Sequence, residues 1–129
     1  MSAVGWQRVE GGLVFLAALA GVLALSVMGR IVPWWLLVIV FFAPDIGFLG
    51  YLLGPRIAAA VYNLLHLYGA GLVMVIAGLL IWGGLKFTIF GLLWMGHVGF
   101  DRMLGYGLKQ PSGFGDTHLG RIGRQADQA

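Results

Sequence analysis

Cysteine is absent from the 129-residue sequence, and charged residues make up only 10% of it. Without cysteine, the chain can form no disulfide, no thiolate metal site and no cysteine nucleophile. A soluble domain usually has about 25% charged residues. Because 60% of the residues are hydrophobic, a soluble fold of this size could not hide its apolar surface. The composition therefore predicts a polytopic membrane protein.

Several functional motifs are also missing. The sequence has no nucleophile elbow, phosphate-binding glycine loop, dinucleotide fingerprint or internal repeat. Its net charge of +3 is small, and the basic residues fall mostly at the ends of apolar segments, which is typical of membrane orientation signals. We therefore expect no nucleic-acid partner, and the expected partner is the lipid bilayer.

Four apolar segments predict four transmembrane helices in an all-α bundle. The predicted spans are 11–29, 33–53, 55–82 and 87–108. The first is longer than the core of a signal peptide, so we expect it to remain uncleaved. The third has about 27 residues, or roughly 40 Å, which is longer than a bilayer core of about 30 Å requires. It therefore either tilts strongly or breaks near Gly69.

The basic residues predict the orientation of the bundle. With the N-terminus in the cytoplasm, six basic residues lie inside and two outside: Arg8, Arg56, Arg102, Lys109, Arg121 and Arg124 against Arg30 and Lys86. This positive-inside bias predicts that both termini are cytoplasmic. The composition becomes polar after Lys109, so we expect a transmembrane bundle over 1–109 and a cytoplasmic tail over 110–129.

Polar side chains interrupt three of the apolar segments. Tyr62, Asn63 and His66 share one face of the third predicted helix, because residues three and four apart are neighbours there. Asp45 follows a proline in the second span, and His97 and Asp101 lie one turn apart in the fourth, followed by Arg102. A helix rises about 1.5 Å per residue, which gives the depth of each polar side chain along its span. By this count the acidic, amide and histidine side chains of the three spans all lie between the midplane and the cytoplasmic face. The spacing therefore predicts one polar site shared by three helices.

Two blocks of sequence resemble a known family. The first comprises Pro44-Asp45, Leu49-Gly50-Tyr51, Gly54-Pro55-Arg56, Tyr62-Asn63 and His66; the second comprises residues 97–102, 104–109 and 116–121. Together they resemble the small bacterial membrane proteins of domain-of-unknown-function family 4260, over nearly the whole chain. The resemblance implies a multi-pass bacterial membrane protein without an established activity, and we expect the protein in the inner membrane.

The polar residues favour a metal-assisted hydrolase-like enzyme acting on a lipid, a lipid-like compound or another small molecule. Histidine and aspartate are ligands for zinc or a similar divalent ion, which can make hydroxide available near neutral pH. The predicted ligands or acid–base groups are Asp45, His66, His97 and Asp101, with His118 as a further ligand from the tail. Asn63 and Tyr62 would orient them, and Arg102 would meet substrate charge.

Three alternatives remain open from the residues alone. Intramembrane carboxylates and imidazoles also form relays in proton- or ion-coupled transporters and channels, for which this short chain would form a homo-oligomer. His66 and His97 could be the axial ligands of a haem. The polar set could also be interhelical glue that only stabilises the bundle.

Overall fold

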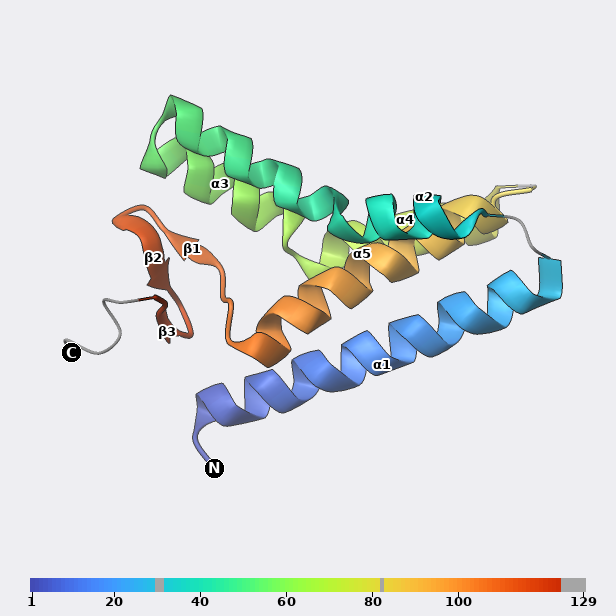
Figure 1. Cartoon of the computed structure of the whole chain (residues 1–129), viewed down its shortest axis with the longest axis horizontal. Coiled ribbons are helices and arrows are strands. Elements are labelled where there is room, and N and C mark those ends of the chain that lie inside the picture. Colours follow the sequence, from blue (N-terminus) through green and yellow to red (C-terminus); the bar gives the residue numbers. More distant parts are fainter. Residues whose placement is uncertain (30–31, 82, 124–129) are drawn as a thin grey trace.

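The computed structural model describes residues 1–29, 32–81 and 83–123 (Figure 1). The helices in chain order are α1 (Ala3–Gly29), α2 (Trp34–Phe42), the 3-10 helix η1 (Ala43–Leu53), α3 (Pro55–Leu65), α4 (Tyr68–Leu80) and α5 (Leu85–Leu104). Three short strands follow: β1 (Lys109–Gln110), β2 (Gly113–Thr117) and β3 (Gly120–Arg121). Arg30, Trp82 and Arg124, which enter the predictions of orientation and span length, lie outside the described residues.

The predicted helical fold is confirmed, and some of its helices are candidate membrane spans. Among the described residues, α1 and the continuous α2–η1 segment are each long and apolar enough to cross a membrane. The α3–α4 pair would be a third span, bent by 40°. The break predicted near Gly69 lies slightly earlier, at His66 and Leu67. The fourth span and the cytoplasmic placement of both termini stay predictions.

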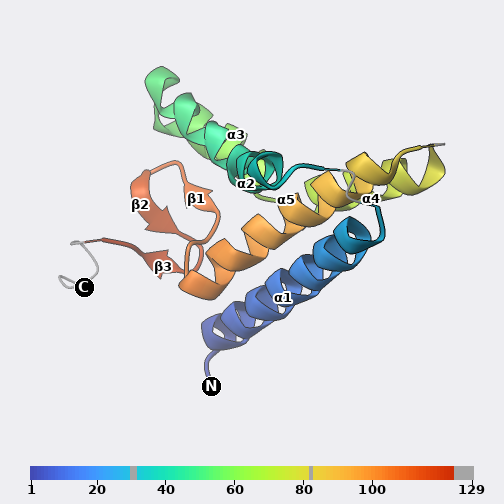
Figure 2. The same ribbon diagram turned by 45° about the vertical axis from the view of Figure 1, so that its right-hand side comes forward.

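Helix α5 is the central element of the bundle. It packs against α1 along one side and α4 along another, with α2 also in contact (Figures 1 and 2). The α4–α5 crossing depends on glycine, because a Cβ atom at Gly91 would lie 2.5 Å from the carbonyl oxygen of Gly71. Many α5 side chains are therefore buried, including Ile89, His97 and Val98, and its polar groups can face protein instead of lipid.

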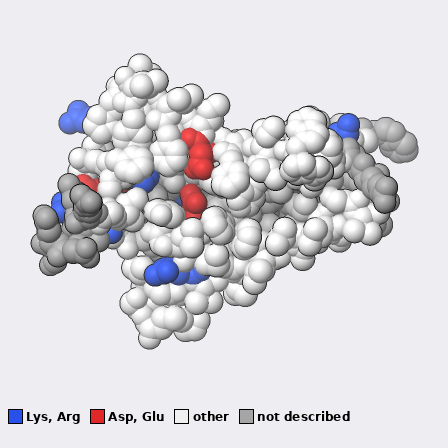
Figure 3. All heavy atoms as spheres, in the orientation of Figure 1, with Lys and Arg blue, Asp and Glu red and all other residues white. Residues whose placement is uncertain are grey.

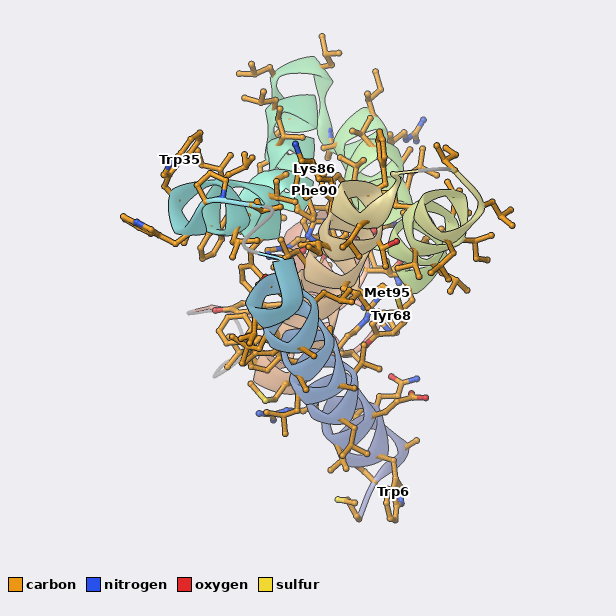
Figure 4. The ribbon with its side chains drawn as sticks, turned by 90° about the vertical axis from the view of Figure 1, so that its right-hand side faces the viewer. Trp6, Trp35, Tyr68, Lys86, Phe90 and Met95 are labelled. Atoms are coloured by element: carbon orange, nitrogen blue, oxygen red, sulfur yellow. The ribbon has the colours of Figure 1, made fainter. Side chains whose placement is uncertain are left out.

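The outer surface is apolar. Large exposed side chains occur along α1, α2, α3 and α4, as expected for helices that contact lipid chains. Trp6 lies at the start of α1 and Trp35 projects outward from α2 (Figure 4). They are 62% and 52% exposed, and both positions suit tryptophan anchors at a membrane–water interface.

The 3-10 conformation of η1 explains its contact with α3. Residues three apart lie on the same side of a 3-10 helix, and Pro44, Gly47 and Gly50 form its buried face. A Cβ atom at Gly50 would lie 2.9 Å from the Cα atom of Ala58 in α3. Gly54 takes no part in this contact, since it caps the C-terminus of η1 at φ 107° and a Cβ atom there would meet nothing within 4 Å.

The tail contains a small antiparallel sheet in the order β1-β2-β3, which the sequence did not predict. Asn63 of α3 joins it to the bundle by two hydrogen bonds: its Nδ2 donates to the Lys109 carbonyl at 2.9 Å, and its Oδ1 accepts from the Lys109 amide at 2.7 Å. The sheet lies beside the ends of α3 and α5 (Figure 2). The predicted boundary between residues 109 and 110 falls within β1.

We expect Asn63→Ala to loosen the sheet while leaving the helices folded. The substitution removes both bonds to Lys109, and each lost bond to a buried partner costs about 1–3 kcal/mol. Hydrogen exchange read by mass spectrometry should show faster exchange over 109–121. Ser112→Ala, which removes a hydrogen bond to Asp116 within the tail and none to the bundle, is the matched control. Unchanged protection in Asn63→Ala would contradict this role.

Candidate metal centre

Four of the predicted site residues converge in the structure. Asp45 comes from the first turn of η1, His66 stands at the C-terminal cap of α3, and His97 and Asp101 lie one turn apart on α5. Each offers one ligand atom, and these atoms all lie within 4.8 Å of one another. Both histidines are buried, with 3% and 2% of their surfaces exposed. Three separate helical elements therefore build one cluster of possible metal ligands.

The separations between the ligand atoms are close to those of a tetrahedral zinc site. The two histidine Nε2 atoms are 3.3 Å apart. Each lies 3.4 Å from one carboxylate oxygen and 3.6 Å from the other. Zinc binds nitrogen and oxygen at about 2.0–2.2 Å, so neighbouring ligands in a tetrahedral site are about 3.3–3.6 Å apart. The donor set and its spacing therefore fit a zinc-like ion.

The hydrogen bonds around His66 leave one ring nitrogen available to bind metal. Its Nδ1 lies 2.9 Å from the Tyr62 carbonyl oxygen. Because a carbonyl can only accept, Nδ1 carries the hydrogen and Nε2 presents a lone pair to the cluster. The Tyr62 ring stacks on His66 with centroids 3.6 Å apart, and its hydroxyl donates to Asp101 at 3.2 Å. Tyr62 thus orients one ligand from each of two helices.

His97 is held mainly by aromatic contacts. Its ring makes edge contacts with Phe41 and Phe42, at centroid distances of 5.3 and 6.0 Å. Nε2 faces the cluster, whereas Nδ1 is buried without a hydrogen-bond partner among the described residues. The apolar surroundings restrict the ring and keep bulk water away from this side of the cluster.

The break between α3 and α4 is stabilised by donors from α5. A helix end leaves carbonyl groups without intrahelical partners. Here the Trp94 indole donates to the Leu65 carbonyl at 2.7 Å, and the Arg102 guanidinium donates to the His66 carbonyl at 3.4 Å. The helix that carries His97 therefore also fixes the backbone of His66.

A cavity of about 320 Å³ adjoins the cluster. It is lined by Asp45, Phe48, Tyr62, Asp101, Tyr106, Lys109, Phe114 and Ile122. The two carboxylates thus face a space that the C-terminal sheet partly encloses. In Figure 3, acidic atoms are visible on this face of the molecule, left of its centre and close to basic atoms. The arrangement gives the cluster access to a ligand.

Lys109 is a site residue that the sequence did not reveal. Only 3% of its surface is exposed, and its Nζ donates to the Phe114 carbonyl at 3.0 Å. The same atom lies 4.1 Å from the ring centroid of Phe114 and 5.3 Å from that of Tyr62. Burial lowers the pKa of the Lys109 ammonium, while Asp101 and Asp45 act in the opposite direction. In the sequence, a lysine just after an apolar segment is typical of an orientation charge.

The other predicted site residues lie outside the cluster. Asn63 holds β1, and His118 accepts a hydrogen bond at Nδ1 from the Leu108 amide at 2.8 Å. Arg102 and His118 line a second cavity of about 110 Å³ with Gln7, Glu10 and Tyr68. Burial and, to a smaller extent, the charge of Arg102 lower the pKa of His118. The structure therefore unites four of the five predicted metal ligands and places His118 elsewhere.

The sequence model of one family, described as "Domain of unknown function (DUF4260)", matches residues 5–122. The chain therefore belongs to this family, as its sequence blocks indicated. No curated protein and no solved structure matches the chain.

Proposed function

We propose that this protein is a metal-assisted membrane enzyme that hydrolyses a lipid or lipid-like substrate. The family description names no activity, so the proposal rests on the geometry of the site. Asp45, His66, His97 and Asp101 would hold one zinc-like divalent ion. The observation that carries this proposal is the convergence of two imidazole nitrogens, 3.3 Å apart, with two carboxylate oxygens that each lie 3.4–3.6 Å from both nitrogens.

The electrostatics of the cluster favour a bound cation. Two carboxylates and the lone pair of His66 Nε2 face one another, and in this form all of them are acceptors. Such groups repel when they are removed from water, and a divalent ion would balance the two negative charges. A haem iron has its axial ligands on opposite faces of the macrocycle. Here one oxygen of each carboxylate lies 3.4–3.6 Å from both histidine nitrogens, in the space that a macrocycle would fill, which supports a bare ion over haem.

The two carboxylates suit different roles. A catalytic zinc site keeps a coordination position for water and lowers the pKa of that water to about 7. Asp45 is the more exposed carboxylate, at 34% against 15% for Asp101, and both line the cavity. Asp101 is held by Tyr62. We therefore assign Asp101 as a fixed ligand of the ion. Asp45 would leave its coordination position to a water molecule and accept a proton from that water.

We also propose that the chain crosses the bacterial inner membrane four times, with both termini in the cytoplasm. The start of α1 and the C-terminal sheet lie at the same end of the molecule, which supports an even number of crossings (Figure 1). Helix α5 would be the fourth span. Its central position supports this, because neighbouring helices cover the charges that would be costly in lipid.

The test is hydrolysis of lipid by purified protein in nanodiscs. With zinc present, mass spectrometry should detect a released acyl chain or headgroup from one lipid class, and a chelator should stop the release until zinc is restored. Asp45→Asn should lower the rate about 100-fold or more, as expected for loss of a general base.

Asp116→Asn removes a carboxylate on the sheet, outside the cluster, and is the matched control for Asp45→Asn. If zinc-loaded protein releases no product from any lipid class, the proposed hydrolase activity is refuted. Proton-flux assays in liposomes would then test the transporter alternative.

A further inference from the structure

We propose that Lys109 recognises an anionic group, a phosphate or carboxylate, on an amphiphilic substrate and holds it in the cavity beside the metal. This inference deepens the proposed function and rests on it. Arg102, which the sequence suggested for substrate charge, lines the second cavity with Glu10. Lys109 is instead the basic residue among those that line the larger cavity.

The position of the Lys109 ammonium is well defined. Asn63 hydrogen-bonds to both the amide and the carbonyl of Lys109, and the side chain passes among aromatic rings to reach the cavity. One N–H group donates to the Phe114 carbonyl. An ammonium has three N–H donors, and among the described residues only this carbonyl accepts a hydrogen bond from Lys109 Nζ, so two donors remain for a ligand. A buried, preoriented cation of this kind binds an anion with little further ordering.

The charge of the cavity supports an anionic ligand. The titratable lining residues are Asp45, Asp101, Lys109, Tyr62 and Tyr106. A divalent ion balances the two carboxylates, and the charge of Lys109 then has no counterpart in the lining. Asp116, the other acid near the sheet, is paired with Arg121 at 2.9 Å. Metal binding would therefore convert an acidic cavity into one that attracts anions.

The remaining walls of the cavity indicate that the ligand is amphiphilic. Phe48, Phe114 and Ile122 are apolar lining residues. Phe114 is 53% exposed and Phe48 is 36% exposed, so the apolar lining continues onto the outer surface. A volume of about 320 Å³ holds a headgroup and the adjoining atoms, while a longer chain would extend outward along these rings.

The experiment measures anion binding to the whole chain, which is loaded with Co²⁺ and embedded in nanodiscs. The visible spectrum of Co²⁺ reports on the ligands around the ion. The probes are octyl phosphate, octanoate, inorganic phosphate, octanol and octyltrimethylammonium. We expect octyl phosphate or octanoate to change the spectrum at the lowest concentrations. Lys109→Met should weaken that binding about 10- to 100-fold, the effect of a lost charge-assisted hydrogen bond, whereas Lys109→Arg should retain most of it.

Lys86→Met is the matched control, because it removes a lysine at the start of α5 (Figure 4), and it should bind anions like the wild type. Co²⁺ uptake by Lys109→Met shows that the site is still formed. Equal anion binding by Lys109→Met and wild type would overturn the proposal, as would preference for octyltrimethylammonium or octanol. Inorganic phosphate that binds as tightly as octyl phosphate would overturn the amphiphilic part. Failure of the wild type to take up Co²⁺ would refute the metal centre itself.

Discussion

Zinc binding should be lost when either His66 or His97 is replaced by alanine. Wild-type protein purified in detergent should contain about one zinc ion per chain, as a single four-ligand site requires. Each substitution removes a ligand that lies 3.3–3.6 Å from the other ligand atoms. Because structural zinc sites supply about 10–16 kcal/mol from four ligands, loss of one should weaken binding roughly 100-fold or more. Elemental analysis and competition with a chelator measure both quantities.

His118→Ala is the matched control for this experiment, since it removes a histidine outside the cluster. It should keep its zinc. Tyr62→Phe removes only the hydroxyl that donates to Asp101, and should weaken binding by about tenfold, as substitutions around metal ligands do. Unchanged zinc content in both His66→Ala and His97→Ala, with normal unfolding temperatures, would rule out the metal centre.

Gly91→Ala should strongly destabilise the bundle. The new Cβ atom would lie 2.5 Å from the Gly71 carbonyl oxygen and 2.6 Å from the Val75 amide nitrogen. Both are backbone atoms, so α4 and α5 must move apart to admit the methyl group. Overpacking of this kind costs about 1–3 kcal/mol. Denaturant unfolding in detergent should show that loss, and weaker zinc binding should accompany it because α5 carries two ligands.

Gly69→Ala offers the same substitution in a different environment. A Cβ atom at Gly69, on the exposed side of α4, meets nothing within 4 Å. Because alanine favours the helical conformation over glycine, this variant should be unchanged or more stable by up to about 1 kcal/mol. Equal stability of the two variants would show that the close α4–α5 crossing does not contribute to the fold.

The apolar helices and the four clustered side chains were predictable from the sequence for simple reasons. A 60% hydrophobic composition predicts long apolar helices, and periodicity places His97 and Asp101 one turn apart on a helix. Asp45 and His66 were predicted to be site residues because burying an ionisable group in an apolar segment is costly unless the group has a partner. Depth counted along each span placed these residues at a common level, and the structure brings all four together.

The roles of Lys109, Asn63 and His118 depended on how the tail returns to the bundle. Nothing in the local pattern around Lys109 shows that a sheet folds over it, because strand pairing joins residues that are distant along the chain. The sequence placed Asn63 on the same helix face as His66 and suggested a role in the site. In the structure its side-chain amide instead forms hydrogen bonds with the backbone of β1. These contacts have no signature in helical periodicity.

The sequence by itself determined which residues had to be buried together, because polar groups in apolar segments must find partners and helical spacing limits where they can point. The tertiary structure alone decided which partners they found. The 3-10 winding of η1, the helix break at His66 and the docking of the sheet set the distances among the four clustered side chains and the lining of the cavity. Those features arise from contacts between distant segments, whose energies no local pattern contains.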